Sequence, residues 1–212
     1  MTQVEAEKHY TLQTYDTAQR FASYHKQLEL LFRIYKPADK VLEIGAGSQV
    51  FASYLKEKKV DIKTADFDEN VHPDILADIR KLPCSDEEFD IVCAFQILEH
   101  LPYEESLKAL QELHRVTKKY LLLSVPYSCI YFGVNFYVGL PFFDKTPNLQ
   151  LRLPNFWLKA NSGNKQHYWE LGRKNFPKRR ILKDLKKIGF EIEKKGSIFF
   201  NKKHYFITCR KK

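Results

Sequence analysis

The stretch Val41-Leu42-Glu43-Ile44-Gly45-Ala46-Gly47-Ser48 decides the fold of this 212-residue chain. Its first four residues have the pattern of a short buried strand, and two glycines follow one residue apart. A helical pattern comes next, with Val50, Phe51 and Leu55 on one side. Glycines allow the backbone to turn tightly and to approach a ligand closely, and the N-terminus of the following helix directs free N–H groups at that ligand.

An acidic residue, Asp66, stands at the end of the next apolar run. Asp66 lies 19 residues beyond Gly47, where a second parallel strand is expected to end. A carboxylate in that position of a doubly wound sheet accepts hydrogen bonds from ribose hydroxyls. Asp68 is the alternative if the strand ends two residues later. The dinucleotide fingerprint requires a third glycine where Val50 stands, which argues against NAD. The pattern predicts a nucleoside-cofactor site.

The glycine segment resembles the first motif of the class I S-adenosylmethionine-dependent methyltransferases, an acidic residue followed by x-Gly-x-Gly. Gln49 occupies the position of that family's third glycine. Order and spacing agree with the family over residues 41–126 through further segments: a third-strand element containing Asp78-Ile79, a fourth strand and turn from Phe89 to Leu101, a helix with Glu112, Arg115 and Val116, and a fifth strand from Tyr120 to Pro126. Five ordered elements are far more specific than one glycine pair.

The resemblance implies an α/β fold with a doubly wound, Rossmann-like sheet of seven mostly parallel strands and a C-terminal antiparallel hairpin. It implies a single methyltransferase domain over residues 1–212, with these parts: a helical cap (1–36), a cofactor-binding core (37–126), an aromatic-rich insertion after the fifth strand (127–176), and a basic C-terminal helix and hairpin (177–212). The implied activity is methyl transfer from S-adenosylmethionine.

The resemblance also assigns residues to the cofactor. Glu43 is expected at the methionine ammonium, and Asp66 at the ribose. The remaining assignments are close backbone approach by Gly45, Ala46 and Gly47, contact of Phe67 with the adenine edge, adenine recognition by Asp78 and Ile79, and lining of the site by Phe95 and Gln96.

His100 is the candidate general base. Some small-molecule members of the family use a histidine after the fourth strand together with an N-terminal tyrosine, which is Tyr15 here. Histidine titrates near neutral pH, which suits removal of a proton from a hydroxyl or ammonium nucleophile. The alternative is that Glu99 and His100 only cap a helix or pack. His167, within a polar cluster over residues 167–170, is a second candidate that either faces the substrate or is structural.

We expect no metal site from the spacing of these residues. His100 and His114 lie fourteen residues apart with no third ligand in view. The four cysteines have no metal-binding or disulfide-framework spacing, which fits a reducing, cytoplasmic setting. The N-terminus has no apolar stretch of the kind found in signal peptides.

Helical spacing predicts an amphipathic helix over residues 17–36, with Phe21, Leu28, Leu31 and Phe32 on its apolar side. A second helix is predicted over residues 178–188, and strands are predicted over residues 190–193 and 204–209.

The segment from Tyr120 to Phe143 contains no charged residue. Its first six residues fit the buried fifth strand, and the prolines and glycines that follow suit a folded insertion better than a membrane-spanning helix. Three hypotheses remain for the aromatic insertion: a lid over the active site, an interfacial membrane contact, and a dimer surface.

Basic residues concentrate at the C-terminal end, where residues 173–212 hold 15 Lys/Arg and three Asp/Glu. Such a segment attracts anionic lipid, nucleic acid or a phosphorylated substrate. The simpler interpretation is that its lysines form the solvated face of the helix whose apolar side is Ile181, Leu182, Leu185 and Ile188. We therefore favour a small or lipid-like methyl acceptor, with contact at the membrane surface left open. A nucleic-acid-modifying or nucleic-acid-binding protein and a non-catalytic partner subunit are the alternatives.

Overall fold

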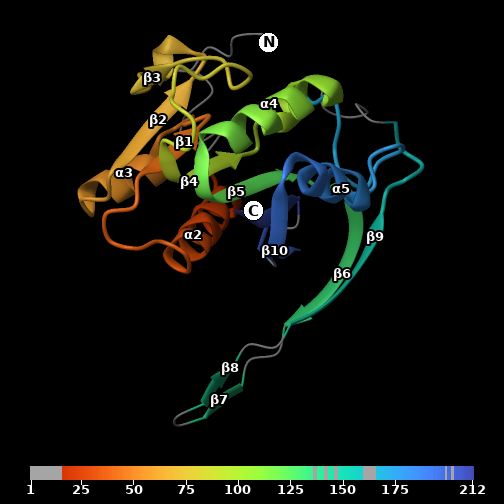
Figure 1. The fold of residues 1–212 in the computed structure, drawn as a ribbon. Coiled ribbons are helices and arrows are strands. Elements are labelled where there is room, and N and C mark those ends of the chain that lie inside the picture. Colours follow the sequence, from red (N-terminus) through yellow and green to blue (C-terminus); the bar gives the residue numbers. More distant parts are fainter. Residues whose placement is uncertain are drawn as a thin grey trace.

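A seven-stranded sheet forms the centre of the protein (Figure 1). The computed structural model describes residues 16–135, 138–140, 143–145, 148–159, 166–198, 200–201 and 203–212. The sheet has the strand order β10-β11-β5-β4-β1-β2-β3. The strands are β1 (Val41–Ile44), β2 (Ile62–Asp66), β3 (Ile75–Leu76), β4 (Phe89–Phe95), β5 (Thr117–Pro126), β10 (Phe190–Ser197) and β11 (His204–Lys211).

Strand directions confirm the predicted fold class. The five strands from β1 to β5 pair in parallel, and β11 is antiparallel to both β5 and β10. Within this order β1 lies between β2 and β4, so that Val41 is level with Ile62 on one side and Ile91 on the other. The carboxyl ends of β1, β2 and β4 therefore meet at one edge, which is where doubly wound sheets bind ligands.

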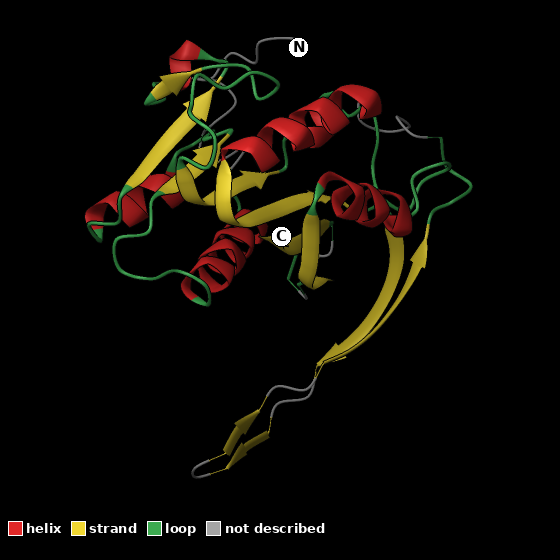
Figure 2. Cartoon of the chain, in the orientation of Figure 1, coloured by secondary structure: helices red, strands yellow, loops and turns green. Residues whose placement is uncertain are grey.

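Helices cover both faces of the sheet (Figures 1 and 2). On one face lie α2 (Ala18–Phe32) and α3 (Val50–Glu57), which contribute to a core that includes Phe51 and Leu55. On the other lie α4 (Tyr103–Val116) and α5 (Lys178–Ile188), whose core includes Leu110 and Leu185. Two short 3₁₀ helices, η1 (Glu69–Val71) and η2 (Leu98–His100), follow β2 and β4.

The apolar side predicted for the first helix is partly wrong. Phe21 and Phe32 are about half exposed, whereas Ser23 and Gln27 are buried beside Leu30 and Leu31. The reason is a polar contact with the sheet: the hydroxyl of Ser23 hydrogen-bonds to Nδ1 of His204 in β11 at 3.0 Å. This contact turns a polar stripe of α2 inward, and spacing of apolar residues does not reveal it.

The amphipathic interpretation of the basic C-terminal helix is confirmed. Ile181 and Leu185 of α5 are buried, and Lys183, Lys186 and Lys187 are exposed. The helix ends at Gly189, whose φ of 120° lies in the region that favours glycine.

The insertion after β5 has two differently placed parts. Its first part is an arm of antiparallel pairs, β6 (Cys129–Asn135) with β9 (Asn148–Pro154) and β7 (Val138–Leu140) with β8 (Phe143–Lys145). The arm projects away from the sheet (Figure 2), so the position of its described strands gives no support to the lid hypothesis. Among the described residues, no helix is long and apolar enough to cross a membrane.

The second part of the insertion, residues 166–176, packs against the core, and we call it the return segment. Its Leu171 pairs with the chain where the insertion begins, accepting from the N–H of Ser128 and donating to the carbonyl of Pro126. Trp169 is fully buried, and its indole N–H donates to the carbonyl of Leu101 at 3.1 Å. The return segment therefore lies beside η2, at the end of β4.

We expect Trp169→Ala to lower the free energy of unfolding by about 3–5 kcal/mol, because the change leaves a large cavity in the core and removes the indole bond to Leu101. Trp157→Ala is the matched control, since Trp157 is 54% exposed, and we expect it to change stability by less than about 0.5 kcal/mol. Urea unfolding of both variants measures the difference, and equal losses would contradict the role given to the return segment.

Candidate active site

The turn after β1 is held by close contacts that require glycine. Gly45 has a φ of 77° and donates its N–H to the carbonyl of Ala65 in β2. A Cβ at Gly45 would lie 2.6 Å from Cδ1 of Ile97, which follows β4. Gly47 also has a positive φ, 49°. The backbone of the turn is therefore fixed against the ends of β2 and β4.

Gln49 adopts the backbone conformation that a glycine would favour. Its φ of 56° is left-handed, and it caps the N-terminus of α3. Its side-chain amide donates to the carbonyl of Val71 in η1, which links the turn to the segment after β2. The departure from the family motif at this position thus leaves the start of the helix intact.

Two buried carboxylates flank the turn. Glu43 in β1 is 6% exposed, and burial raises its pKa to about 8, with nearby Asp66 adding to the effect. Oε2 of Glu43 has no hydrogen-bond partner among the described residues. Asp66, which ends β2, is 8% exposed, and burial also raises its pKa. A buried carboxylate oxygen without a donor marks a place where a ligand cation or hydroxyl fits.

The point where β2 ends favours Asp66 over Asp68 as the candidate ribose-binding carboxylate. β2 ends at Asp66, whose Oδ1 accepts from the N–H of Asp68 at 3.1 Å. The carboxylate of Asp68 is occupied in capping η1, where it accepts from the backbone and side-chain amides of Asn70. Phe67 between them is 40% exposed.

The predicted adenine residues lie past the short strand β3. Ile79 is buried in the core, and Asp78 is paired with Arg80. The guanidinium of Arg80 lowers the pKa of Asp78, so this carboxylate is ionised and still has acceptor capacity. At the end of β4, Phe95 packs edge-on against Phe51 of α3 at 5.6 Å between ring centroids.

Gln96 follows with a left-handed φ of 58° and is fixed to the neighbouring strand. Its backbone N–H donates to the carbonyl of Ser124 in β5, and its side-chain amide donates to the hydroxyl of the same residue. Gln96 and Ile97 therefore stand where the carboxyl ends of β1, β4 and β5 meet.

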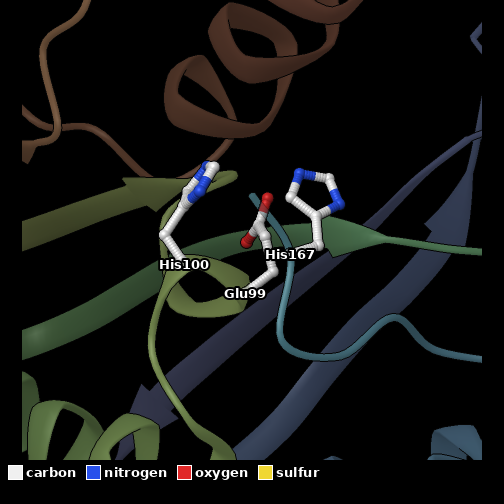
Figure 3. A group of neighbouring side chains, drawn as sticks. All are labelled: Glu99, His100 and His167. Carbon is white, nitrogen blue, oxygen red and sulfur yellow. The ribbon is translucent and has the colours of Figure 1, made fainter. Parts of the chain in front are cut away.

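The structure brings together two predicted catalytic residues that are distant in sequence. The rings of His100 in η2 and His167 in the return segment meet edge-to-face, with centroids 5.1 Å apart. Nδ1 of His100 lies 3.1 Å from the carbonyl of Gln166, and Nδ1 of His167 lies 3.0 Å from Oε1 of Glu170. Figure 3 shows the two rings on either side of Glu99. Tyr15, the third predicted catalytic residue, lies outside the described residues.

Glu99, for which the sequence analysis considered only capping or packing, lies in the same cluster. It is fully buried, and neither carboxylate oxygen accepts a hydrogen bond of normal geometry from any described residue. Burial raises its pKa to about 7, an effect partly offset by His167. The available signal was an acidic residue directly after Ile97 and Leu98, in the apolar segment that follows β4. His114, which the sequence analysis considered with His100 as a metal ligand and set aside, packs against Phe190.

Comparison with known proteins now identifies the family. The sequence profile of a family described as a methyltransferase domain matches residues 16–195. The chain belongs to this methyltransferase family. Together with the sheet order, the match confirms the predicted class I S-adenosylmethionine-dependent methyltransferase. No curated protein matches the chain.

Solved structures share the fold at low sequence identity. A protein from Pyrococcus horikoshii OT3 is similar at 14% identity with a TM-score of 0.64, covering 99% of this chain and 100% of its own. Magnesium protoporphyrin IX methyltransferase from Synechocystis PCC 6803, with bound S-adenosylhomocysteine, has 15% identity and a TM-score of 0.61, covering 92% and 84%. A glycopeptide N-methyltransferase has 10% identity and a TM-score of 0.55, covering 88% and 89%.

The buried carboxylates of the methyltransferase fit its cofactor. Oε2 of Glu43 offers an unpaired buried acceptor to an ammonium group. A Cβ at Gly45 would clash with Ile97, so only glycine lets the turn pack this closely against the residue after β4. A buried acceptor beside this turn is compatible with the ammonium group of S-adenosylmethionine.

We expect the methyltransferase without cofactor to lose stability as the pH rises from about 4.5 to about 8 because of Glu43. In this window the folded protein retains a proton that the unfolded chain releases, since the folded pKa is about 8 and the ordinary value is 4.5. One such group contributes a slope of up to about 1.4 kcal/mol per pH unit.

Urea unfolding at a series of pH values measures this slope. Glu43→Gln removes the titrating group, so the free energy of unfolding of the variant should fall less steeply with pH. Carboxylates that do not interact with Glu43 contribute equally to both proteins and cancel in the difference, so the difference reports Glu43 together with its neighbour Asp66. Parallel curves for the two proteins would show that Glu43 does not hold the proton.

Proposed function

We propose that this methyltransferase transfers the methyl group of S-adenosylmethionine, by in-line displacement, to a small or lipid-like acceptor bound where β4 ends. One arrangement supports the proposal. Ile97 contacts the glycine turn at Gly45 and directly precedes the segment that carries Glu99 and His100. A cofactor at the turn and an acceptor at the histidines would therefore be neighbours.

The cofactor supplies the reactive methyl group, and the protein supplies orientation. We assign the methionine ammonium to Glu43, backbone approach to Gly45, Ala46 and Gly47, and the ribose hydroxyls to Asp66. For the adenine we propose Phe67, Asp78 and Ile79, with Phe95 and Gln96 lining the site. Holding two reactants in line is worth on the order of 7–11 kcal/mol, so few catalytic groups are needed.

On the acceptor side we propose that His100 takes the proton of the nucleophile. A bond from Nδ1 to the carbonyl of Gln166 requires this nitrogen to be the donor, which leaves the lone pair of the neutral ring on Nε2. His167 is the second candidate, because its ring meets that of His100. Tyr15 is proposed as the tyrosine partner.

The arm supports a lipid-like acceptor reached at a membrane surface. Its described side chains expose an unusual amount of apolar area on an isolated two-stranded ribbon. These side chains are Ile130, Tyr131, Phe132, Val134, Leu151 and Leu153, followed after β9 by Phe156 and Trp157. Exposed apolar patches of this kind are typical of interaction sites. The arm begins at Ser128, which bonds to the return segment beside the histidines.

No observation on the described residues favours a nucleic-acid substrate or partner as strongly as the exposed arm favours a lipid-like acceptor. Part of the basic charge near the C-terminus is neutralised within the fold, by the pairs Arg180–Glu104, Arg210–Glu191 and Lys211–Glu87.

Calorimetric titration with S-adenosylhomocysteine tests the cofactor assignment. We expect Asp66→Asn to weaken binding by about 10- to 100-fold, because hydrogen bonds from ribose hydroxyls to a charged acceptor are lost. Asp86→Asn is the matched control, since its side chain is 77% exposed. Equal affinity in both variants would remove Asp66 from the site, and no binding by the unaltered protein would overturn the proposed function.

Tryptophan fluorescence tests the membrane contact. The chain has two tryptophans, and Trp169 is fully buried, so a change on adding lipid vesicles reports Trp157. We expect a blue shift with vesicles of mixed anionic and zwitterionic phospholipid, because the indole enters the interface. Trp157→Phe should lose the shift, and Phe132→Ser should weaken binding. An emission spectrum unchanged by vesicles would contradict a lipid contact through the arm.

A further inference from the structure

Three potential metal ligands converge beside the end of β4. Glu99 and His100 come from η2, and His167 comes from the return segment. Each offers one ligand atom, and these atoms all lie within 4.8 Å of one another. Figure 3 shows the carboxylate of Glu99 beside the two imidazole rings. Donors around a zinc ion at about 2.0–2.2 Å lie closer together than this limit, so small side-chain rotations complete the set.

Both histidines are oriented as metal ligands usually are. The Nδ1 atom of His100 faces the carbonyl of Gln166, and that of His167 faces the carboxylate of Glu170. Glu170 is itself fixed by Arg173, whose Nε lies 2.7 Å from Oε2. A histidine that binds a metal through one nitrogen almost always donates from the other to a carbonyl or carboxylate, which fixes the ring and its tautomer.

Glu99 supplies an independent observation. It is fully buried, and neither of its oxygens accepts a hydrogen bond of normal geometry from the part of the chain that the structure describes. An isolated buried carboxylate is strongly unfavourable unless a cation or donors compensate it. Neither helix capping nor packing explains a carboxylate in this state, whereas a cation between Glu99 and the two histidines does.

We propose that Glu99, His100 and His167 bind a divalent transition-metal ion, with zinc as the best match. One carboxylate and two imidazoles are a ligand set of catalytic zinc sites, which keep a further position open for water or substrate. The metal site itself does not depend on the proposed function. Only the role given to the ion does: it would bind the oxygen of the acceptor and favour release of the acceptor's proton to solvent.

A bound ion changes the part that His100 plays. A nitrogen that binds a metal cannot accept a proton, so in the metal-bound protein the ion replaces His100 in activating the acceptor. Both roles place activation of the acceptor at His100 and its neighbours, and they differ in whether added zinc is required.

Metal titration of the full-length protein tests the inference. After removal of metals with a chelator, zinc is titrated by calorimetry and cobalt(II) by its visible absorption. We expect one equivalent of either ion to bind. Glu99→Gln keeps the shape of the side chain and removes its charge, and His167→Ala removes a ligand. Each should weaken zinc binding at least tenfold, whereas His25→Ala, at an exposed position of α2, should leave it unchanged.

S-adenosylhomocysteine titrated in parallel reports folding and the cofactor site separately. Unchanged zinc affinity in Glu99→Gln and His167→Ala, with cofactor-product binding retained, overturns the metal site. The absence of a stoichiometric site in the unaltered protein also overturns it. Loss of S-adenosylhomocysteine binding by the unaltered protein would instead overturn the proposed function, and would leave the zinc result to be judged by itself.

Discussion

The contact between Gly45 and Ile97 is the constraint on which the candidate site depends. The turn after β1 passes so close to the residue after β4 that a Cβ would lie 2.6 Å from the isoleucine side chain. The contact sets the separation between the glycine turn and the start of η2. Because η2 carries Glu99 and His100, the same contact determines how far a ligand at the turn lies from the histidines. A larger residue at position 45 would displace both sides of the site together.

The buried carboxylate oxygens without a hydrogen-bond partner among the described residues lie at this edge of the sheet. In the part of the chain that the structure describes, the other buried side-chain atoms without a partner are neutral and belong to Gln27, Tyr127, Asn155, Ser197 and Thr208. Ser106 and Thr117, by comparison, donate to backbone carbonyls. Glu43 and Glu99, by contrast, each have at least one carboxylate oxygen with no partner among the described residues. Each unpaired carboxylate oxygen lowers the stability of the protein when no ligand is bound. Such groups are expected where a ligand supplies the missing partner, and their two positions correspond to the proposed cofactor position and the proposed acceptor position.

Patterns of nearby residues in the sequence predicted the helices and strands that form through local interactions. The strand before Gly45, the helix after it and the apolar side of α5 follow from periodicity and glycine position. Long-range contacts were not predictable in this way. Ser23 is buried because it meets His204, far along the chain, and no spacing within α2 indicates this. The sequence named His100 and His167 separately, but their meeting depends on how the insertion returns to the core.

That return is determined by packing and not by the length of the insertion. The partner of His100, the carbonyl of Gln166, is 66 residues further along the chain. Trp169 places this segment, because its buried ring packs against Tyr103 and its N–H reaches Leu101. The arm enters and leaves beside the same point, where Ser128 bonds to Leu171. In the proposed function the arm would therefore bind an amphiphile or a membrane without moving the histidines, since the two parts of the insertion are separated by this anchor. Under that proposal, recognition of the acceptor and its activation belong to different segments of one insertion.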